Sequence, residues 1–236
     1  MPEFRSKLGD DGNDNNLSSA VMDAPGGPLA QWHQAHPNGD PVAWQEEKAL
    51  NKDLLRRFRG GPFIIDQFSY AGSYDMYSRM FRCVHEGFPG IAYRVGMHLI
   101  GSKNAPPQQF MVFSIDTPRA VPRTAIRPTG ALDSFKRGRG YQGIKTDDKD
   151  FDQHYHVQSE DERFVQALLT PTFKQFIRTN PLPSLLSFVF DGNTLSTWNR
   201  WQVLAENGDH YRLDYMSMMI DYLVQIMRAT PPELWR

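Results

Sequence analysis

The stretch that decides the predicted fold opens with Phe151-Asp-Gln-His-Tyr-His-Val157 and runs to Trp198. Apolar and polar residues alternate at its start, with the two-residue period of a half-buried strand. Ser159 and Glu162 then have the spacing of a capping box, which predicts that a short helix begins there. The buried side of this helix is expected to consist of Phe164, Val165, Leu168 and Leu169.

The second half of this stretch predicts another short helix and a hairpin. Thr170 and Pro171 fit the N-cap and the first residue of the helix, and Pro181 and Pro183 end it. Residues 185–190 and 194–198 read as two strands of a β-hairpin, because the Asp191-Gly192 pair between them tolerates the positive φ angles of a tight turn. The apolar side of the helix is expected to be Phe173, Phe176 and Ile177.

Upstream of this stretch, residues 63–127 predict an antiparallel meander. Aromatic and β-branched residues are grouped in short runs that Gly, Pro, Asn and Asp separate. The segment from Pro118 to Pro128 is extended but interrupted by proline, so we assign it to an edge of the sheet. The other expected strands cover residues 63–68, 76–84, 91–100 and 109–115.

The remaining segments complete the predicted organisation. Residues 1–40 are rich in Gly, Asp, Asn and Pro and predict a flexible N-terminal arm, which is followed by one globular domain over residues 41–236. A helix is expected from Pro41 to Phe58, and a loop over about residues 129–150. Asp209 is expected to cap a C-terminal helix that Thr230-Pro-Pro ends. Its apolar positions are Leu213, Met216, Ile220, Leu223 and Met227, where the methionines indicate adaptable core packing rather than a ligand groove.

Composition narrows the class of protein. The chain has 236 residues, of which 40% are hydrophobic and 12% aromatic, and this is ample for a packed core. A net charge of −1 gives no overall attraction to nucleic acid or anionic lipid. The single cysteine, Cys83, suits a reducing compartment, and neither a signal peptide nor an apolar run of roughly 20 residues is present. We therefore expect a cytoplasmic protein that does not insert into a membrane.

Two patterns in the sequence are compatible with catalysis. Asp152, His154 and His156 share one face if residues 151–157 form a strand, and two imidazoles with a carboxylate can bind zinc, iron or manganese. The same alternation is also typical of the solvent face of any half-buried strand. Cys83 and His85 share a face in the same way and resemble a nucleophile with its base, although a lone cysteine is usually a small buried apolar residue.

Two other patterns are compatible with binding. The loop Lys136-Arg137-Gly-Arg139-Gly-Tyr141 combines mobile cations with an aromatic ring, which could follow a phosphate backbone and stack on a base. Three cations in a loop are also often simply solvated. Trp32, within Gln-Trp-His-Gln-Ala-His, could contact either the body of the protein or a partner.

The order of elements also resembles a family of uncharacterised bacterial proteins, many of them actinobacterial. The resemblance covers about residues 54–228 and is carried mostly by packing positions. In that family, transmembrane helices often precede the α+β unit, and none is expected in this sequence. The resemblance implies the fold but no activity. The segments that carry it are Leu54-Leu-Arg-Arg-Phe58, Gly61-Pro-Phe63, residues 63–70, Ala120-Val-Pro-Arg123, residues 151–157, where Tyr155 replaces the common Phe, and Leu168-Leu-Thr-Pro171.

These observations predict an α+β fold: an antiparallel β-meander plus a C-terminal β-hairpin, with short helices and a C-terminal helix packed on one face. The expected function is that of a non-catalytic cytoplasmic interaction or regulatory protein of a bacterium or phage, with a protein partner and no cofactor. The oligomeric state stays open. The alternatives are a nucleic-acid-binding protein that uses residues 136–141 and a metal-dependent hydrolase that uses Asp152, His154 and His156.

Overall fold

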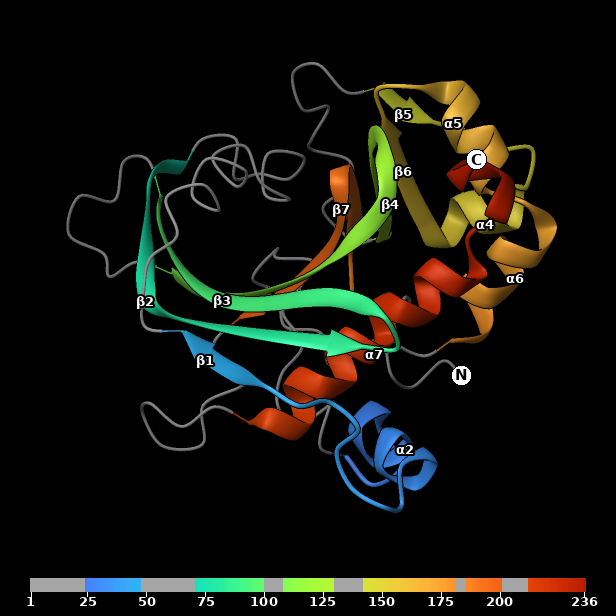
Figure 1. The fold of residues 1–236 in the computed structure, drawn as a ribbon. Coiled ribbons are helices and arrows are strands. Elements are labelled where there is room, and N and C mark those ends of the chain that lie inside the picture. Colours follow the sequence, from blue (N-terminus) through green and yellow to red (C-terminus); the bar gives the residue numbers. More distant parts are fainter. Residues whose placement is uncertain (1–23, 48–70, 100–107, 130–141, 181–185, 201–211) are drawn as a thin grey trace.

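The computed structural model describes residues 24–47, 71–99, 108–129, 142–180, 186–200 and 212–236. Within this part of the chain, the fold is α+β and contains a seven-stranded antiparallel sheet (Figure 1). The strands are β1 Gln45–Glu47, β2 Ala71–His85, β3 Phe88–Leu99, β4 Gln108–Pro128, β5 Gln142–Ile144, β6 Tyr155–Ser159 and β7 Phe188–Arg200. The helices are α2 Pro28–Ala35, α4 Lys149–His154, α5 Glu162–Leu168, α6 Pro171–Thr179, α7 Leu213–Ala229 and the 3-10 helix η6 Pro232–Trp235.

Strand β4 is the centre of the sheet. It pairs with β3 over its first half and with β6 over its second half, while β7 pairs with it over both halves. The prediction that the segment from Pro118 to Pro128 lies at an edge is therefore wrong. Pro118 and Pro122 are accommodated because the β4–β7 register shifts between Asp116 and Val121 and again between Val121 and Thr124. Proline is tolerated within a sheet at such irregular positions.

Strand β7 corrects the predicted hairpin. Residues 188–200 form one continuous strand, and the segments on both sides of Asp191-Gly192 pair with the same neighbour, β4. Gly192 has a φ of +57° and lies opposite Val121 at the register shift. A glycine with positive φ is found in β-bulges as well as in tight turns. The Asp191-Gly192 pair therefore marks a β-bulge within β7 and not the predicted hairpin turn.

Residues 149–159 also differ from the prediction. Asp148 caps α4 by accepting a hydrogen bond from the Phe151 N–H, and the strand β6 begins only at Tyr155. Because the helix buries Phe151 and stacks its ring on Tyr155 at 4.8 Å, the apolar residues at 151 and 155 follow a helical rather than a strand spacing.

Helices α5 and α6 confirm most of the predicted local signals. Thr170 caps α6 and Pro171 is its first residue, as expected. The cap of α5 is Asp161 rather than Ser159, because the Asp161 carboxylate accepts from the N–H groups of Arg163 and Phe164 while Ser159 ends β6. The expected apolar positions are buried in both helices, apart from Phe176, which is partly buried.

Helix α7 crosses one face of the sheet and forms the middle of the core (Figure 1). It ends before Thr230-Pro-Pro as predicted, and its four methionines are buried, which agrees with core packing. Leu213, in contrast, is 47% exposed, and Asp209 lies outside the described residues. The buried side chains of α4, α5 and α6 join the same core cluster.

The strand register explains how α7 can lie close to the sheet. Two rows of side chains cross β2, β3, β4 and β7 on the α7 face, Phe81-Ala92-Phe113-Thr197 and Cys83-Gly90-Ile115-Leu195. In the second row, a Cβ atom at Gly90 would lie 2.9 Å from Cys83 Sγ and 3.3 Å from Ile220 Cδ1. Glycine is thus the residue that allows α7 to approach the middle of the sheet.

The N-terminal segment is more ordered than predicted. Residues 28–35 form α2, whose Leu29 and Trp32 are buried in the core, so this part of the expected flexible arm is docked on the body. Residues 45–47 form β1 instead of the expected helix. Residues 1–23 and 48–70 lie outside the described part of the chain, and so does the predicted strand at residues 63–68. The expected loop over residues 129–150 contains β5 and the start of α4.

Candidate functional site

Helix α7 carries a stripe of polar side chains in an otherwise apolar surrounding. Ser217, Asp221 and Gln225 follow one another at intervals of four residues, which places them on one side of the helix. We call these three residues the α7 polar stripe. Each of them makes a hydrogen bond to a different element of the fold. The stripe is therefore the place where the N-terminal segment, the sheet and the region after α6 meet.

Ser217 holds residues 40–44 against α7. Its hydroxyl lies 2.6 Å from Asp40 Oδ2, and it accepts a hydrogen bond of 2.9 Å from the Trp44 indole N–H. The other Asp40 oxygen accepts from the Val42 N–H at 2.8 Å. Together with α2 and β1, these residues form a continuous segment, residues 28–47, which we call the N-terminal strap.

Asp221 is the central group of the stripe. Its carboxylate accepts hydrogen bonds from His85 Nε2 at 3.1 Å and from Gln225 Nε2 at 2.7 Å. His85 and Asp221 are only 5% and 7% exposed. Burial alone would raise the pKa of Asp221, but the hydrogen bonds from His85 and Gln225 outweigh burial and hold its pKa below the ordinary value. Asp221 is therefore ionised at neutral pH, and it joins β2 to α7.

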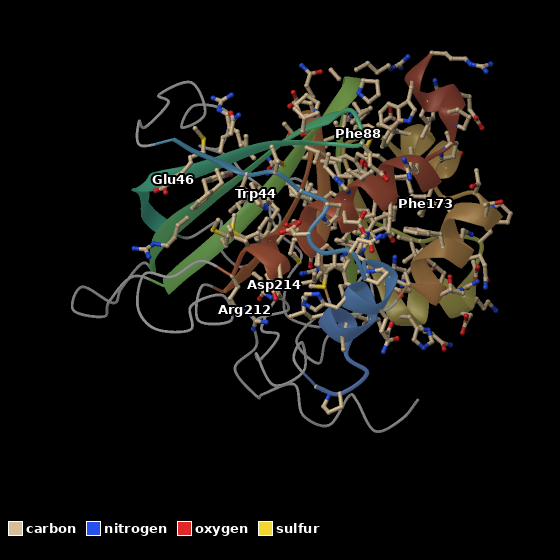
Figure 2. All side chains as sticks on the ribbon, turned by 60° about the horizontal axis from the view of Figure 1, so that its bottom comes forward. Trp44, Glu46, Phe88, Phe173, Arg212 and Asp214 are labelled. Atoms are coloured by element: carbon tan, nitrogen blue, oxygen red, sulfur yellow. The ribbon has the colours of Figure 1, made fainter. Side chains whose placement is uncertain are left out.

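The strap docks on the start of α7 through α2. Trp32 is buried, and its ring contacts the rings of His33 and His36 at centroid distances of 5.3 Å and 4.5 Å. His33 Nε2 lies 3.3 Å from Asp214 Oδ2. Figure 2 shows Asp214 and Arg212 beside α2, and Trp44 further along the strap. In this structure, Trp32 therefore contacts the body of the protein.

This geometry does not provide an activated nucleophile. The Ser217 hydroxyl bonds to Asp40 or to the Leu213 carbonyl, whereas the imidazole of His85 bonds to Asp221. Cys83 shares the α7 face with His85, as predicted, but burial, with a smaller effect from Asp40, raises the pKa of its thiol to about 12. A thiol with this pKa stays protonated at neutral pH and is a poor nucleophile.

The buried thiol gives a direct prediction of reactivity. We expect Cys83 in the native protein to react with iodoacetamide at pH 8 at least about a hundredfold more slowly than in the urea-unfolded chain, because only the thiolate reacts and burial limits access. Mass spectrometry of timed samples measures both rates. Equal rates in the two states would contradict the buried position of Cys83.

The three residues of the predicted metal site do not share a face. Asp152 lies in α4 and accepts hydrogen bonds from the N–H and hydroxyl groups of Thr146 at 3.0 Å each. His154 ends the same helix and bonds to the Asp150 carbonyl, and His156 lies in β6. The prediction required all three residues to lie in one strand, but β6 begins only after His154. Among the described residues, no group of three His, Cys, Asp or Glu side chains is placed to hold a metal ion.

The residues of the predicted nucleic-acid site, Lys136, Arg137, Arg139 and Tyr141, lie outside the described residues. Within the described part of the chain, no helix is long and apolar enough to cross a membrane.

Sequence reasoning missed the stripe for identifiable reasons. His85 was paired with its neighbour Cys83, whereas its partner Asp221 is 136 positions away. Asp40 and Trp44 were assigned to a flexible arm and to a helix. The spacing of Ser217, Asp221 and Gln225 was visible, because three polar residues four positions apart interrupt an apolar helix. That spacing alone would have indicated a polar contact along one side of α7.

No protein-family model matches the chain, and no curated protein matches it. Among solved structures, the chain is similar to the crystal structure of the mycobacterial trehalose monomycolate transport factor A, TtfA, with 12% sequence identity and a TM-score of 0.47. The match covers 87% of this chain and 95% of that chain. A similarity at this level carries no inference about function.

Proposed function

We propose that this chain is a non-catalytic interaction protein that binds another protein. The observation that supports the proposal is that the side chains with catalytic potential are engaged in structural hydrogen bonds. His85, Asp221 and Ser217 each form hydrogen bonds between separate elements of the fold. The thiol of Cys83 is buried and protonated. Groups that could perform acid–base or nucleophilic chemistry instead hold β2 and the N-terminal strap on α7.

Two sequence observations are compatible with this proposal. The resemblance to actinobacterial proteins implies the α+β unit without an activity, and the single cysteine suits the cytoplasm. A bacterial or phage origin stays part of the proposal. The proposal does not rest on Trp32, whose side chain is buried against the body of the protein.

Capture of partners after cross-linking in cells of the source organism tests the interaction. The bait variants are the intact chain, a chain that lacks residues 1–23, and a Lys136→Ala/Arg137→Ala/Arg139→Ala variant, each with and without nuclease treatment. We expect one protein to be enriched with the intact bait after nuclease treatment and to bind the purified chain directly. Recovery of nucleic acid that is lost with the three cations and with added salt would replace the proposal by the nucleic-acid alternative.

Chemical profiling tests the absence of catalysis. A fluorophosphonate probe and a chloroacetamide probe are applied to the native protein, and we expect no adduct on Ser217 or Cys83. The matched control is Asp221→Asn, which removes the partner of His85. An adduct on Ser217 or Cys83 of the native protein that this variant abolishes would identify an active nucleophile and overturn the proposal.

A further inference from the structure

The polar groups of α7 that bind the N-terminal strap each have a second partner on the body. The Ser217 hydroxyl can donate either to the strap, at 2.6 Å, or to the Leu213 carbonyl of its own helix, at 2.8 Å. Asp214 lies 3.3 Å from His33 of the strap and 3.7 Å from Arg212. Departure of the strap therefore leaves neither Ser217 nor Asp214 without a partner, so the body does not oppose it through these groups.

The contact between β2 and α7 under the strap is made by groups of the body alone. Asp221 accepts hydrogen bonds from His85 at 3.1 Å and from Gln225 at 2.7 Å, and none of these three residues belongs to the strap. The surface on which the strap lies therefore keeps its shape through its own hydrogen bonds.

The strap, in contrast, depends on the body for its structure. Helix α2 has eight residues and no side-chain cap at its start, and helices of this length are marginal in water on their own. Strand β1 has three residues. The indole Nε1 of Trp32 is buried, and no acceptor within the described residues reaches it, which opposes docking. We therefore expect the strap to open before the body unfolds.

The strap shows which kind of segment this surface accepts. Leu29 and Trp32 lie one helical turn apart in α2, and both are buried. The chain then becomes extended, and two of its side chains meet the Ser217 hydroxyl. The Asp40 carboxylate accepts from it at 2.6 Å, and the Trp44 indole N–H donates to it at 2.9 Å. The surface thus binds a short amphipathic helix followed by a carboxylate and an aromatic N–H donor.

The same surface extends beyond the strap. Leu213 lies one turn before Ser217, on the side of α7 that carries the polar stripe, and it is 47% exposed although the strap is docked. A segment that reaches further along α7 than the strap does would cover this side chain. The surface therefore offers a partner an apolar contact that the strap does not use.

We propose that the partner protein binds at the surface beneath the strap, and that the strap covers this surface until the partner displaces it. We call this surface the strap site; it includes Phe81, Leu213, Asp214 and Ser217. The partner enters with a segment of the same chemistry as the strap, a short helix with two apolar side chains one turn apart, followed by an extended stretch with a carboxylate and an aromatic N–H donor. This inference rests on the proposed function, because it names the site of that interaction.

A fluorescently labelled peptide of residues 24–47 tests whether the strap site accepts a segment from another molecule. It is titrated, with anisotropy as the readout, against the full-length variant Trp32→Asp/Trp44→Asp, which we call the loosened variant because its own strap is weakened while the strap site is unchanged. We expect it to bind this variant at least about tenfold more tightly than the wild-type chain, whose own strap competes at an effective concentration on the order of 1 mM. A peptide with the same two substitutions should not bind. Equal affinity for the two proteins, or no binding to either, would overturn the proposal.

Two substitutions on the polar stripe locate the bound peptide. Ser217→Ala in the loosened variant should weaken peptide binding roughly tenfold, because the carboxylate and the indole of the peptide both lose their partner. Gln225→Ala is the matched control, since Gln225 bonds to Asp221 and Asn180 rather than to the strap, and it should leave the affinity unchanged. The same affinity in both variants would show that the peptide does not occupy the strap site.

Hydrogen exchange of the wild-type chain tests the opening of the strap without any substitution. The amides of α2 should exchange at least about a hundredfold faster than those in the middle of α7, because the strap opens while the body stays folded. Mass spectrometry of the two segments measures both rates. Equal rates, or loss of the fold of the body in the loosened variant, would mean that the strap is an inseparable part of the core and would overturn the proposal.

The partner identified by cross-linking separates this inference from the proposed function. Once purified, it should displace the labelled peptide from the loosened variant, and it should bind that variant more tightly than the wild-type chain. A partner that binds directly but leaves the peptide in place would overturn this inference and keep the proposed function. If the peptide binds but no partner is found, the proposed function fails and this inference fails with it.

Discussion

Asp221→Ala is expected to lower the free energy of unfolding by roughly 3–5 kcal/mol, which would make it one of the most destabilising single substitutions in the chain. The substitution leaves the imidazole of His85 buried at 5% exposure without its carboxylate and removes the acceptor of Gln225. Urea unfolding at pH 7, followed by circular dichroism, measures the change. Asp214→Ala in the same helix is the matched control, since its pair with His33 is largely exposed and is expected to contribute less than about 1 kcal/mol.

The same carboxylate gives the stability a dependence on pH. Because the pKa of Asp221 is lower in the folded than in the unfolded chain, its contribution is fully present above its unfolded pKa and is lost as the pH falls through its folded pKa. In Asp221→Asn, this part of the acid destabilisation should be absent. An equal loss of stability below pH 4 in the wild type and the variant would show that Asp221 is not an ionised partner of His85.

Phe113→Ala is expected to lower the free energy of unfolding by roughly 3–5 kcal/mol, because the substitution leaves a cavity in the middle of the core. Phe113 is fully buried in β4, between Ala92 of β3 and Thr197 of β7, on the face that α7 covers. Thermal unfolding and urea unfolding both measure the loss. Val84→Ala, at a strand position that is 68% exposed, should change the stability by less than about 0.5 kcal/mol. Similar effects of the two substitutions would contradict the assigned faces of the sheet.

The sequence predicted the elements whose signals are local. Thr170 and Pro171 begin α6 and Thr230-Pro-Pro follows α7, because capping and proline chemistry act within a few residues. The fold class followed from aromatic and β-branched runs that do form β2, β3 and β4. An antiparallel sheet with a C-terminal helix on one face could therefore be predicted from the sequence.

The predictions from the sequence were wrong where one local signal suits two kinds of backbone structure, or where a residue's hydrogen-bond partner lies far away along the chain. Asp191-Gly192 suits both a tight turn and a bulge, and only the pairing of β7 with β4 distinguishes them. The alternation from residue 151 to 157 fitted a strand, while the cap at Asp148 favoured a helix. The pairing of His85 with Asp221 depends on how α7 crosses the sheet, which no spacing along the chain specifies.

The place of α7 in the chain affects how the protein can be synthesised. The ribosome completes β2, β3 and β4 by residue 128, but the helix that covers one face of these strands ends only at Ala229. During the translation of about a hundred further residues, α7 cannot cover Phe81, Phe113 or Ile115. An uncovered apolar sheet face is a site of aggregation in a nascent chain. We therefore expect the nascent polypeptide to require a chaperone that covers this face of the sheet until α7 has emerged from the ribosome.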